Sequence, residues 1–223
     1  MLIQIGSAVV LPEGRLLMDA RHQCMIYTGS PKTHIPGLAR TIIEQLKANK
    51  RCMYLNNAGM VAAMKSDLVA AGLDVAGEMQ HGSLVMSSKK DHLLEKQFDV
   101  DRMIGKLSSA VDEAIGDGYR GLWATGDMTW EMGDDISFEK LFAYECALEV
   151  LFRRRPELSG VCQYHHDKLP DDSFHAALLT HRTTYVNETL SRMNPFYSRQ
   201  ESPVPRKLSS PRVTKMLARA ASY

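Results

Sequence analysis

His22 and Cys24 stand two residues apart at the start of a short apolar stretch that ends at Tyr27. Side chains two residues apart in an extended strand point to the same face. An imidazole and a thiol on one face can bind a metal ion or hold a polar group of a ligand. The alternative is a buried free thiol with a histidine at the start of the strand, because free cysteine is among the most buried residue types.

A carboxylate and an indole follow another apolar stretch, in the segment Gly126-Asp127-Met128-Thr129-Trp130. An acidic side chain just past a core strand lies at the edge of a sheet where ligands bind. Asp127 could therefore bind a metal, hold a polar ligand group or act as a base. The alternative is an aspartate that caps the next helix or forms a turn. Trp130 could form the wall of a pocket or pack on the surface.

Further polar residues interrupt apolar stretches later in the chain. Cys162 and Tyr164 share one face of a predicted strand, and the histidine pair at 165–166 is interpreted as loop residues that point apart. Glu145 lies in the middle of an apolar helical stretch. On the core side it would need a partner, and a solvated helix face is the simpler interpretation. His181 lies between a helix and the last strand and could reach the ligand edge.

Apolar runs and helical periodicity alternate along the chain. The runs predict strands at 22–27, 52–55, 83–86, 121–125, 161–164 and 183–186. Apolar residues at helical spacing predict helices at 36–49, 59–71, 100–115, 138–155 and 171–179, with a further turn at 74–79. Strands that alternate with helices of this length favour βαβ units. The chain is therefore predicted to be an α/β protein with a mostly parallel sheet.

The turn after the first predicted strand of this sheet lacks the features of a phosphate-binding loop. Thr28 to His34 contains Lys32-Thr33, but the first glycine of a Walker A loop is absent and Pro31 has no N–H to offer. No GxGxxG follows a strand, and no GxSxG nucleophile elbow occurs. Binding and hydrolysis of ATP are therefore weak hypotheses.

Composition and charge indicate one main domain with two extensions. The 223 residues are 44% hydrophobic and 24% charged, which is typical of soluble globular proteins. We interpret residues 1–19 as a lead segment, 20–194 as the main domain and 195–223 as a basic tail with proline and serine. The tail holds six Lys/Arg against one Glu, so the rest of the chain is net −4. Nucleic-acid binding is therefore not expected except through the tail. A helix is predicted at 213–221, in a tail that is mobile or packs on a partner.

Membrane and export signals are not evident in the sequence. No apolar run reaches the roughly 20 residues that span a bilayer, and the first residues lack the basic region of a signal peptide. Cys24, Cys52, Cys146 and Cys162 show no CxxC spacing. This pattern favours reduced, buried thiols in a cytoplasmic protein.

The motifs, taken in order, resemble the MEDS family (methanogen/methylotroph, DcmR-type sensory domain) over residues 20–190. The resemblance is carried by His22-x-Cys24-x-x-Tyr27, Arg51-Cys52-Met53-Tyr54-Leu55, Gly118-Tyr119-Arg120-Gly121-Leu122, Gly126-Asp127-Met128-x-Trp130, Tyr144-Glu145, Cys162-Gln163-Tyr164 and Thr180-His181. Two positions depart from the family pattern. Asp127 stands where the family usually has Glu, and Arg182 stands where it usually has Pro.

The resemblance implies a RecA/KaiC-like three-layer α/β fold that has lost its Walker A loop. It implies a sensory module for small hydrocarbon derivatives, found alone or joined to DNA-binding or kinase modules. As a hypothesis, the ligand pocket lies at the carboxyl edge of the sheet, where open α/β sheets bind ligands. The predicted ligand-binding residues are His22, Cys24, Tyr27, Asp127, Trp130, Glu145, Cys162, Tyr164 and His181.

We therefore expect a cytoplasmic regulatory module, not an enzyme, that binds a small molecule and has no membrane association. Its partner would be a kinase, an anti-sigma-type protein or a transcription regulator, and a homodimer is one option. No cofactor is predicted; if a metal binds, His22 and Cys24 are the expected ligands. The alternatives are a thiol- or metal-dependent enzyme that uses Cys24 or Cys162, an inert scaffold, and a residual nucleotide-binding protein.

Overall fold

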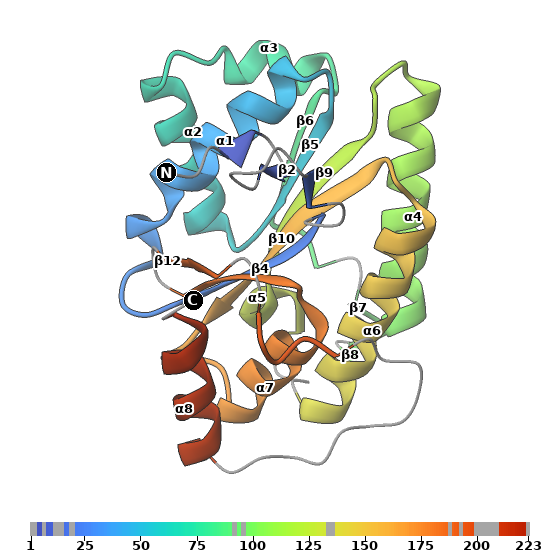
Figure 1. Cartoon of the computed structure of the whole chain (residues 1–223). Coiled ribbons are helices and arrows are strands. Elements are labelled where there is room, and N and C mark those ends of the chain that lie inside the picture. The colour runs from blue at the N-terminus through green and yellow to red at the C-terminus, as the bar shows by residue number, and fades with distance from the viewer. Residues whose placement is uncertain are drawn as a thin grey trace.

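The computed structural model describes residues 4–5, 8–10, 16–17, 21–90, 93–94, 97–132, 137–186, 189–191, 194–198 and 210–221. Its centre is a seven-stranded sheet in the order β12-β11-β4-β10-β9-β5-β6 (Figure 1). The strands are β4 (His22–Tyr27), β5 (Arg51–Leu55), β6 (Leu84–Ser87), β9 (Leu122–Asp127), β10 (Leu158–His165), β11 (Thr183–Val186) and β12 (Thr189–Ser191). All pair in parallel except β12, which runs antiparallel to β11. The predicted α/β class with a mostly parallel sheet is confirmed.

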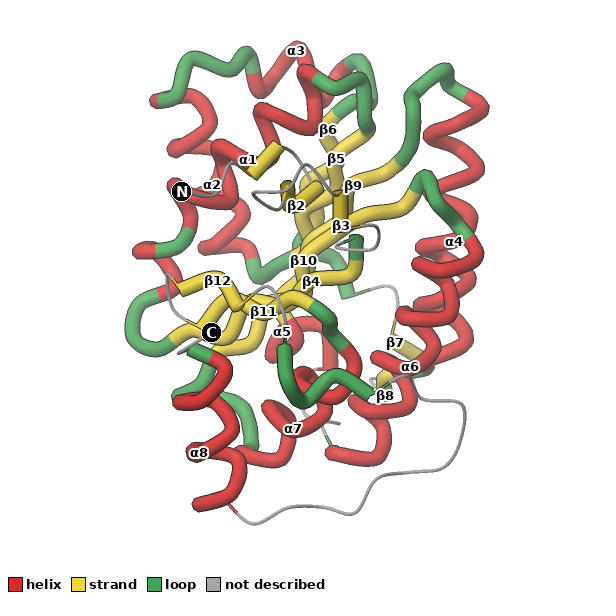
Figure 2. The backbone as a smooth tube through the Cα atoms, in the orientation of Figure 1, coloured by secondary structure: helices red, strands yellow, loops and turns green. Residues whose placement is uncertain are grey.

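Helices cover both faces of this sheet, which gives the three layers visible in Figure 2. One face packs against α1 (Ile35–Lys47), α2 (Ala58–Ala70) and α3 (Val75–Gln80). The other face packs against α4 (Val100–Gly116), α5 (Met128–Met132), α6 (Phe138–Arg154), α7 (Asp171–Thr180) and α8 (Ser210–Ala220). We call this second face the α6 face.

The central strand β10 shows how residue alternation divides the core into two halves. All eight of its residues are buried, because a parallel strand in mid-sheet is covered on both faces. Val161 belongs to the apolar cluster beneath α1, whereas Cys162 and Tyr164 belong to the cluster on the α6 face. Gly160 allows the neighbouring strand to approach closely, since a Cβ there would meet the carbonyl oxygen of Ala124 at 2.1 Å.

Capping side chains mark the starts of several helices, and glycines follow the ends of two. The side chains of Asn57, Asp99 and Ser137 accept hydrogen bonds from backbone amides of the first turns of α2, α4 and α6. Such caps satisfy N–H groups that the helix itself leaves without partners. Gly72 and Gly118, just past the ends of α2 and α4, adopt φ values of 88° and 86° that glycine reaches without strain.

Three smaller elements complete the described part of the chain. β1 (Gln4–Ile5), β2 (Ala8–Val10) and β3 (Leu16–Leu17) form a three-stranded antiparallel sheet within the predicted lead segment. β7 (Leu93–Leu94) and β8 (Gln97–Phe98) form a two-stranded sheet that the polar sequence around it did not predict. A 3-10 turn, η1 (Pro31–Thr33), follows β4.

The C-terminal helix belongs to the main core. The helix predicted at 213–221 is observed as α8, and it packs on α7 and β11 of its own chain. Val213, Leu217 and Ala220 are buried in the apolar cluster of the α6 face, and the red α8 lies beside α7 in Figure 1. The expectation that this helix is mobile or packs on a partner is therefore wrong. Because the apolar residues of α8 recur at helical spacing, they lie on one face of the helix, and this face packs against the rest of the domain.

Among the described helices, none combines the length and the apolarity that crossing a bilayer requires.

We predict that Leu217→Ala lowers the free energy of unfolding by about 2–5 kcal/mol, because it leaves a cavity between α8 and the domain. Lys215→Ala, an exposed change on the same helix, should stay within about 0.5 kcal/mol of the wild type. Urea denaturation of both variants measures the difference. Equal stabilities would show that α8 contributes nothing to the core.

Candidate functional site

The structure separates the nine predicted ligand-binding residues into two groups. His22, Cys24, Glu145, Cys162, Tyr164 and His181 lie together on the α6 face of the sheet, and we call them the buried cluster. Tyr27, Asp127 and Trp130 lie at the carboxyl ends of the strands. His22 and Tyr27 lie at opposite ends of β4, about 17 Å apart for six extended residues, whereas Tyr164 directly follows Gln163, the register partner of Asp127. The structure therefore does not gather all nine residues around the carboxyl edge.

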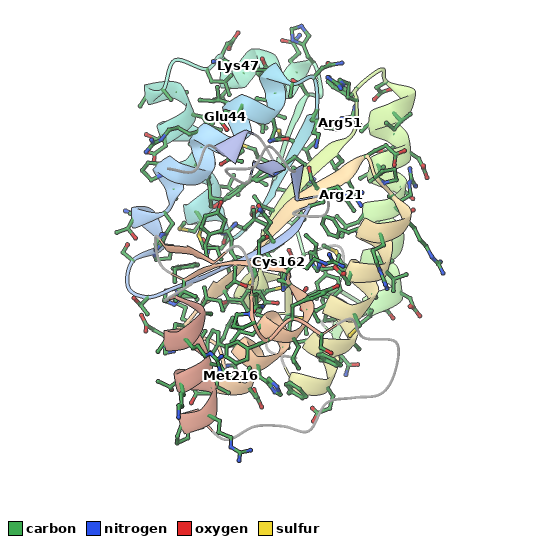
Figure 3. The ribbon with its side chains drawn as sticks, in the orientation of Figure 1. Arg21, Glu44, Lys47, Arg51, Cys162 and Met216 are labelled. Atoms are coloured by element: carbon green, nitrogen blue, oxygen red, sulfur yellow. The ribbon has the colours of Figure 1, made fainter. Side chains whose placement is uncertain are left out.

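Two neighbouring strands and two helices bring the buried cluster together. β4 and β10 pair so that Cys24 lies opposite Cys162 and His22 lies opposite Gly160. Glu145 comes from the middle of α6, and His181 is the residue that ends α7. Cys162 lies in the middle of the molecule in Figure 3. The solvated helix face considered for Glu145 is ruled out, since its side chain is 0% exposed.

Four donor atoms of this cluster converge. Nε2 of His22 and Nε2 of His181 lie 3.3 and 3.4 Å from Oε2 of Glu145. Sγ of Cys162 lies 3.7 Å from Nε2 of His22 and 3.9 Å from Oε2 of Glu145. Within the described part of the chain, these four side chains form the set that could hold a metal ion.

Cys24 is beside this set but not part of it. Its sulfur lies 3.4 Å from Oγ1 of Thr184 on the neighbouring strand β11 and donates to that hydroxyl. The sulfur beside the imidazole of His22 is thus that of Cys162, whereas the sequence suggested Cys24. The expected sharing of one sheet face by His22 and Cys24 holds, but the sulfur nearest the imidazole comes from the adjacent strand.

An outer layer of acceptors and donors orients the cluster. Nδ1 of His22 donates to Oε2 of Glu149 at 3.0 Å, and Nδ1 of His181 donates to the carbonyl oxygen of Ala177 at 2.8 Å. The hydroxyl of Tyr164 donates to Oε1 of Glu145. These contacts fix both imidazole rings and leave each Nε2 directed at the Glu145 carboxylate.

Burial and neighbouring charges shift the pKa values of the ionisable residues in the cluster. Burial favours the neutral carboxyl of Glu145, but His181, His22 and the Tyr164 hydroxyl outweigh it and lower the pKa. Burial likewise opposes a charge on His22, yet Glu145 and Glu149 raise its pKa. Burial and the neighbouring His22 lower the pKa of His181 to about 4. An ionised carboxylate thus lies between two imidazoles whose pKa values shift in opposite directions.

The thiols of the cluster are poor nucleophiles in this environment. Burial raises the pKa of Cys24 and of Cys162 above the usual thiol value, and the nearby Glu145 raises both further. Burial therefore disfavours the thiolate, which is the reactive form of cysteine, at both sulfurs.

At the carboxyl edge, Asp127 acts mainly as a structural acceptor. Its Oδ2 accepts from the hydroxyl of Tyr27 at 3.1 Å, and its Oδ1 accepts from the amide of Trp130 at 3.1 Å. The capping role considered for this residue is therefore observed. His165 is the last residue of β10 and is buried against the Tyr27 ring, so its assignment to a loop was wrong.

A cleft of about 220 Å³ opens at this edge, and we call it the edge cleft. Pro31, Asn57, Lys90, Thr129 and Lys168 line it from the segments that follow β4, β5, β6, β9 and β10. Trp130 and His165 form part of its wall, with Asp127 beneath. The edge cleft thus lies where the carboxyl ends of five parallel strands converge.

Two acidic residues that matter here were not among the predicted site residues. Glu149 supports His22, and its spacing of four from Glu145 could have indicated that both lie on one helix face. Glu131 is 3% exposed and accepts from the hydroxyl of Tyr144 at 3.0 Å. Gly126 makes room for it, because a Cβ there would meet its Oε1 at 1.5 Å. The closeness of Glu131 to the Gly126-Asp127 motif in the sequence could have indicated that Glu131 belongs to this region.

The comparisons with known proteins agree with the motif pattern. The family model for the MEthanogen/methylotroph, DcmR Sensory domain matches residues 21–182. The chain belongs to the MEDS family. A comparison with curated proteins finds no match. Among solved structures, an ATPase domain is similar at 10% identity, over 74% of this chain and 69% of that one, with a TM-score of 0.48. At this identity the likeness concerns the fold alone.

The two departures of this MEDS chain from the family pattern have defined surroundings. Asp127, the shorter carboxylate, still caps α5 and receives the Tyr27 hydroxyl. Arg182, which replaces the usual proline, places its guanidinium 4.9 Å from the centre of the Tyr197 ring. That contact adds a cation–π interaction at the outer side of the buried cluster.

We predict that Glu131 makes this MEDS chain less stable as the pH rises. Burial raises the pKa of Glu131 from 4.5 to about 8. Between these values the unfolded chain has lost a proton that the folded chain keeps. The free energy of unfolding therefore falls with pH, by at most about 1.4 kcal/mol per unit. Glu131→Gln should remove this loss.

The measurement is urea denaturation of wild type and Glu131→Gln at several values between about pH 5 and pH 8. The stability of the variant relative to wild type should increase across this range. Glu113→Gln, an exposed change on α4, is the control and should show no such trend. A constant difference between Glu131→Gln and wild type would contradict the assignment.

Proposed function

We propose that this MEDS chain is a sensory module that binds a small organic anion in the edge cleft and signals to a partner protein. The observation that carries the proposal is the edge cleft itself. Open parallel α/β sheets bind their ligands at the carboxyl ends of the strands, and this cleft collects residues from five such ends. The MEDS family description, a sensory domain, supports a regulatory role.

The lining of the edge cleft favours an anionic or strongly polar group. Lys90 and Lys168 are exposed at its rim, and His165 lies in its wall. Oγ1 of Thr129 is buried and finds no hydrogen-bond partner among the described residues, which leaves a hydroxyl available for a ligand. A carboxylate or phosphate group would satisfy these donors together.

An apolar ligand body has a neighbouring surface available. Trp130 lines both the edge cleft and a second cleft of about 200 Å³, whose lining includes Met53, Leu55 and Val85. By contrast, the cavity next to Cys162 and Glu131 measures about 30 Å³, room for only one or two waters. These volumes favour the edge cleft over the buried cluster as the place for an organic molecule such as a hydrocarbon acid.

A nucleotide is the alternative ligand, but the backbone amide that would bind its phosphate already has a protein partner. In nucleotide-binding α/β proteins, backbone amides of the loop after a strand hold phosphate oxygens. Here the amide of Gly29, just after β4, donates to Oδ2 of Asp167 at 2.8 Å, and this bond lowers the pKa of Asp167. A protein carboxylate thus occupies the amide that a phosphate would need, while Pro31 offers none.

The proposal is tested with thermal shifts in acetate, propionate, butyrate and methyl phosphate, since a ligand that binds the folded state raises Tm. At least one should raise the Tm of the wild type in a saturable manner. The double variant Lys90→Ala plus Lys168→Ala should bind that compound about tenfold to a hundredfold less tightly, because charged hydrogen bonds are lost.

The matched control is Lys47→Ala. Lys47 is exposed at the end of α1, at the opposite edge of the sheet from the cleft, and is labelled in Figure 3. Its removal changes the net charge but should leave the affinity unaltered. Equal weakening in the control, or the absence of any shift in the wild type with all four compounds, would refute the edge cleft as the anion site.

A further inference from the structure

We propose that His22, Glu145, Cys162 and His181 form a tetrahedral binding site for one divalent transition-metal ion, and that the ion is zinc. The inference goes beyond the proposed ligand in the edge cleft, because it concerns other residues, a different ligand and the opposite end of β4. Four side chains from β4, α6, β10 and the end of α7 supply one donor atom each, and all four atoms lie within 4.8 Å of one another.

The spacing of the donors fits one tetrahedral ion. Zinc binds nitrogen and oxygen at about 2.0–2.1 Å and thiolate sulfur at about 2.3 Å, so tetrahedral geometry puts donor pairs about 3.3–3.6 Å apart. The two nitrogen–oxygen separations here are 3.3 and 3.4 Å. Sγ of Cys162 lies 3.7 Å from Nε2 of His22 and 3.9 Å from Oε2 of Glu145. The remaining two pairs, from Nε2 of His181 to Nε2 of His22 and to the sulfur, lie within 4.8 Å. An ion at the centre therefore requires the donors, above all Nε2 of His181, to move closer together.

The outer hydrogen bonds prepare the donors for a cation. A histidine that binds metal usually donates its other ring nitrogen to a carboxylate or a backbone carbonyl. His22 donates from Nδ1 to Glu149, and His181 donates from Nδ1 to the carbonyl oxygen of Ala177. Both neutral rings would then carry their lone pair on Nε2, the atom that faces the centre. Tyr164 holds the carboxylate of Glu145 through Oε1, which leaves Oε2 for the ion.

The charges of the four ligands balance a divalent ion. One carboxylate and one thiolate neutralise its two positive charges, and the imidazoles add none. Neutrality matters because all four side chains are at most 6% exposed, and an uncompensated charge is costly there. Nε2 of His181 is buried and makes no hydrogen bond to any described residue. A metal ion would give that atom its partner.

The donor set selects zinc among common cations. Imidazole and thiolate together favour Zn²⁺ over the oxygen-binding Mg²⁺ and Ca²⁺. Four protein ligands complete a tetrahedral shell and leave no position for water or substrate. Such closed sites hold structure together, whereas catalytic zinc sites keep one position open. The ion would fasten α6 and α7 to strands β4 and β10.

The test uses the full chain stripped with a chelator and then titrated with Zn²⁺ and, separately, with Co²⁺. One Zn²⁺ per chain should bind and raise Tm. Bound Co²⁺ should give the intense visible bands of a tetrahedral ion and a thiolate charge-transfer band in the near ultraviolet. Absence of stoichiometric Zn²⁺ binding, or weak octahedral-type Co²⁺ bands, would overturn the proposal.

The cysteine pair provides a matched control. Cys162→Ser should abolish the thiolate charge-transfer band, whereas Cys24→Ser should keep it. Both residues are buried at paired positions of adjacent strands, but only Cys162 faces the other donors. A charge-transfer band that survives in Cys162→Ser, or one that disappears in Cys24→Ser, would overturn the ligand assignment. Circular dichroism of each stripped variant establishes that it is folded.

Glu149→Gln tests the outer layer without removing a ligand. It should weaken Zn²⁺ binding by about 10–100-fold, the usual effect of losing the carboxylate behind a metal-bound histidine. The tetrahedral Co²⁺ spectrum should remain. An unchanged affinity would contradict the role of Glu149 in orienting His22. Because none of these experiments contains an organic anion, their outcome is independent of the edge cleft.

Discussion

The ionised carboxylate of Glu145, which is fully buried, is the constraint around which the interior of this protein is arranged. An isolated charge in the core would cost several kcal/mol. His22, His181 and the Tyr164 hydroxyl surround this one and hold its pKa low. They come from β4, the end of α7 and β10, so the polar contacts and the packing of α6 and α7 on the sheet depend on each other. Removal of one partner would leave the charge uncompensated.

The buried cluster and the edge cleft lie at different positions along the same two strands, β4 and β10. β10 carries Cys162 and Tyr164 in its middle and His165 at its carboxyl end, and β4 carries His22 at one end and Tyr27 at the other. A shift of either strand along its axis would therefore move both sites. Protein interiors are close-packed, so the β4–β10 pair physically connects the edge cleft with the buried cluster.

Helix α6 and the segment after β12 extend the cluster outward. Glu149, one turn beyond Glu145, receives a hydrogen bond from the hydroxyl of Tyr197 at 2.8 Å. Asn194 donates to the carbonyl oxygens of Leu178 and His181, which ties the same segment to the end of α7. Next to it, α8 packs on α7 and β11. The described C-terminal residues thus continue the core.

The sequence by itself determined the fold class, most element positions and many of the chemically important side chains, although Glu131 and Glu149 were missed. Apolar periodicity located the parallel strands and their helices, and alternation placed His22 with Cys24 and Cys162 with Tyr164 on single faces. Periodicity says which face a side chain takes, but not which residues of other elements meet it there. Only the tertiary structure decided that Cys162 approaches His22 while Cys24 turns to Thr184. It also decided that α6 aims Glu145 inward and that His22, Cys162 and His181 gather around Glu145. These placements depend on strand register and helix packing, which are set by contacts between residues distant in sequence.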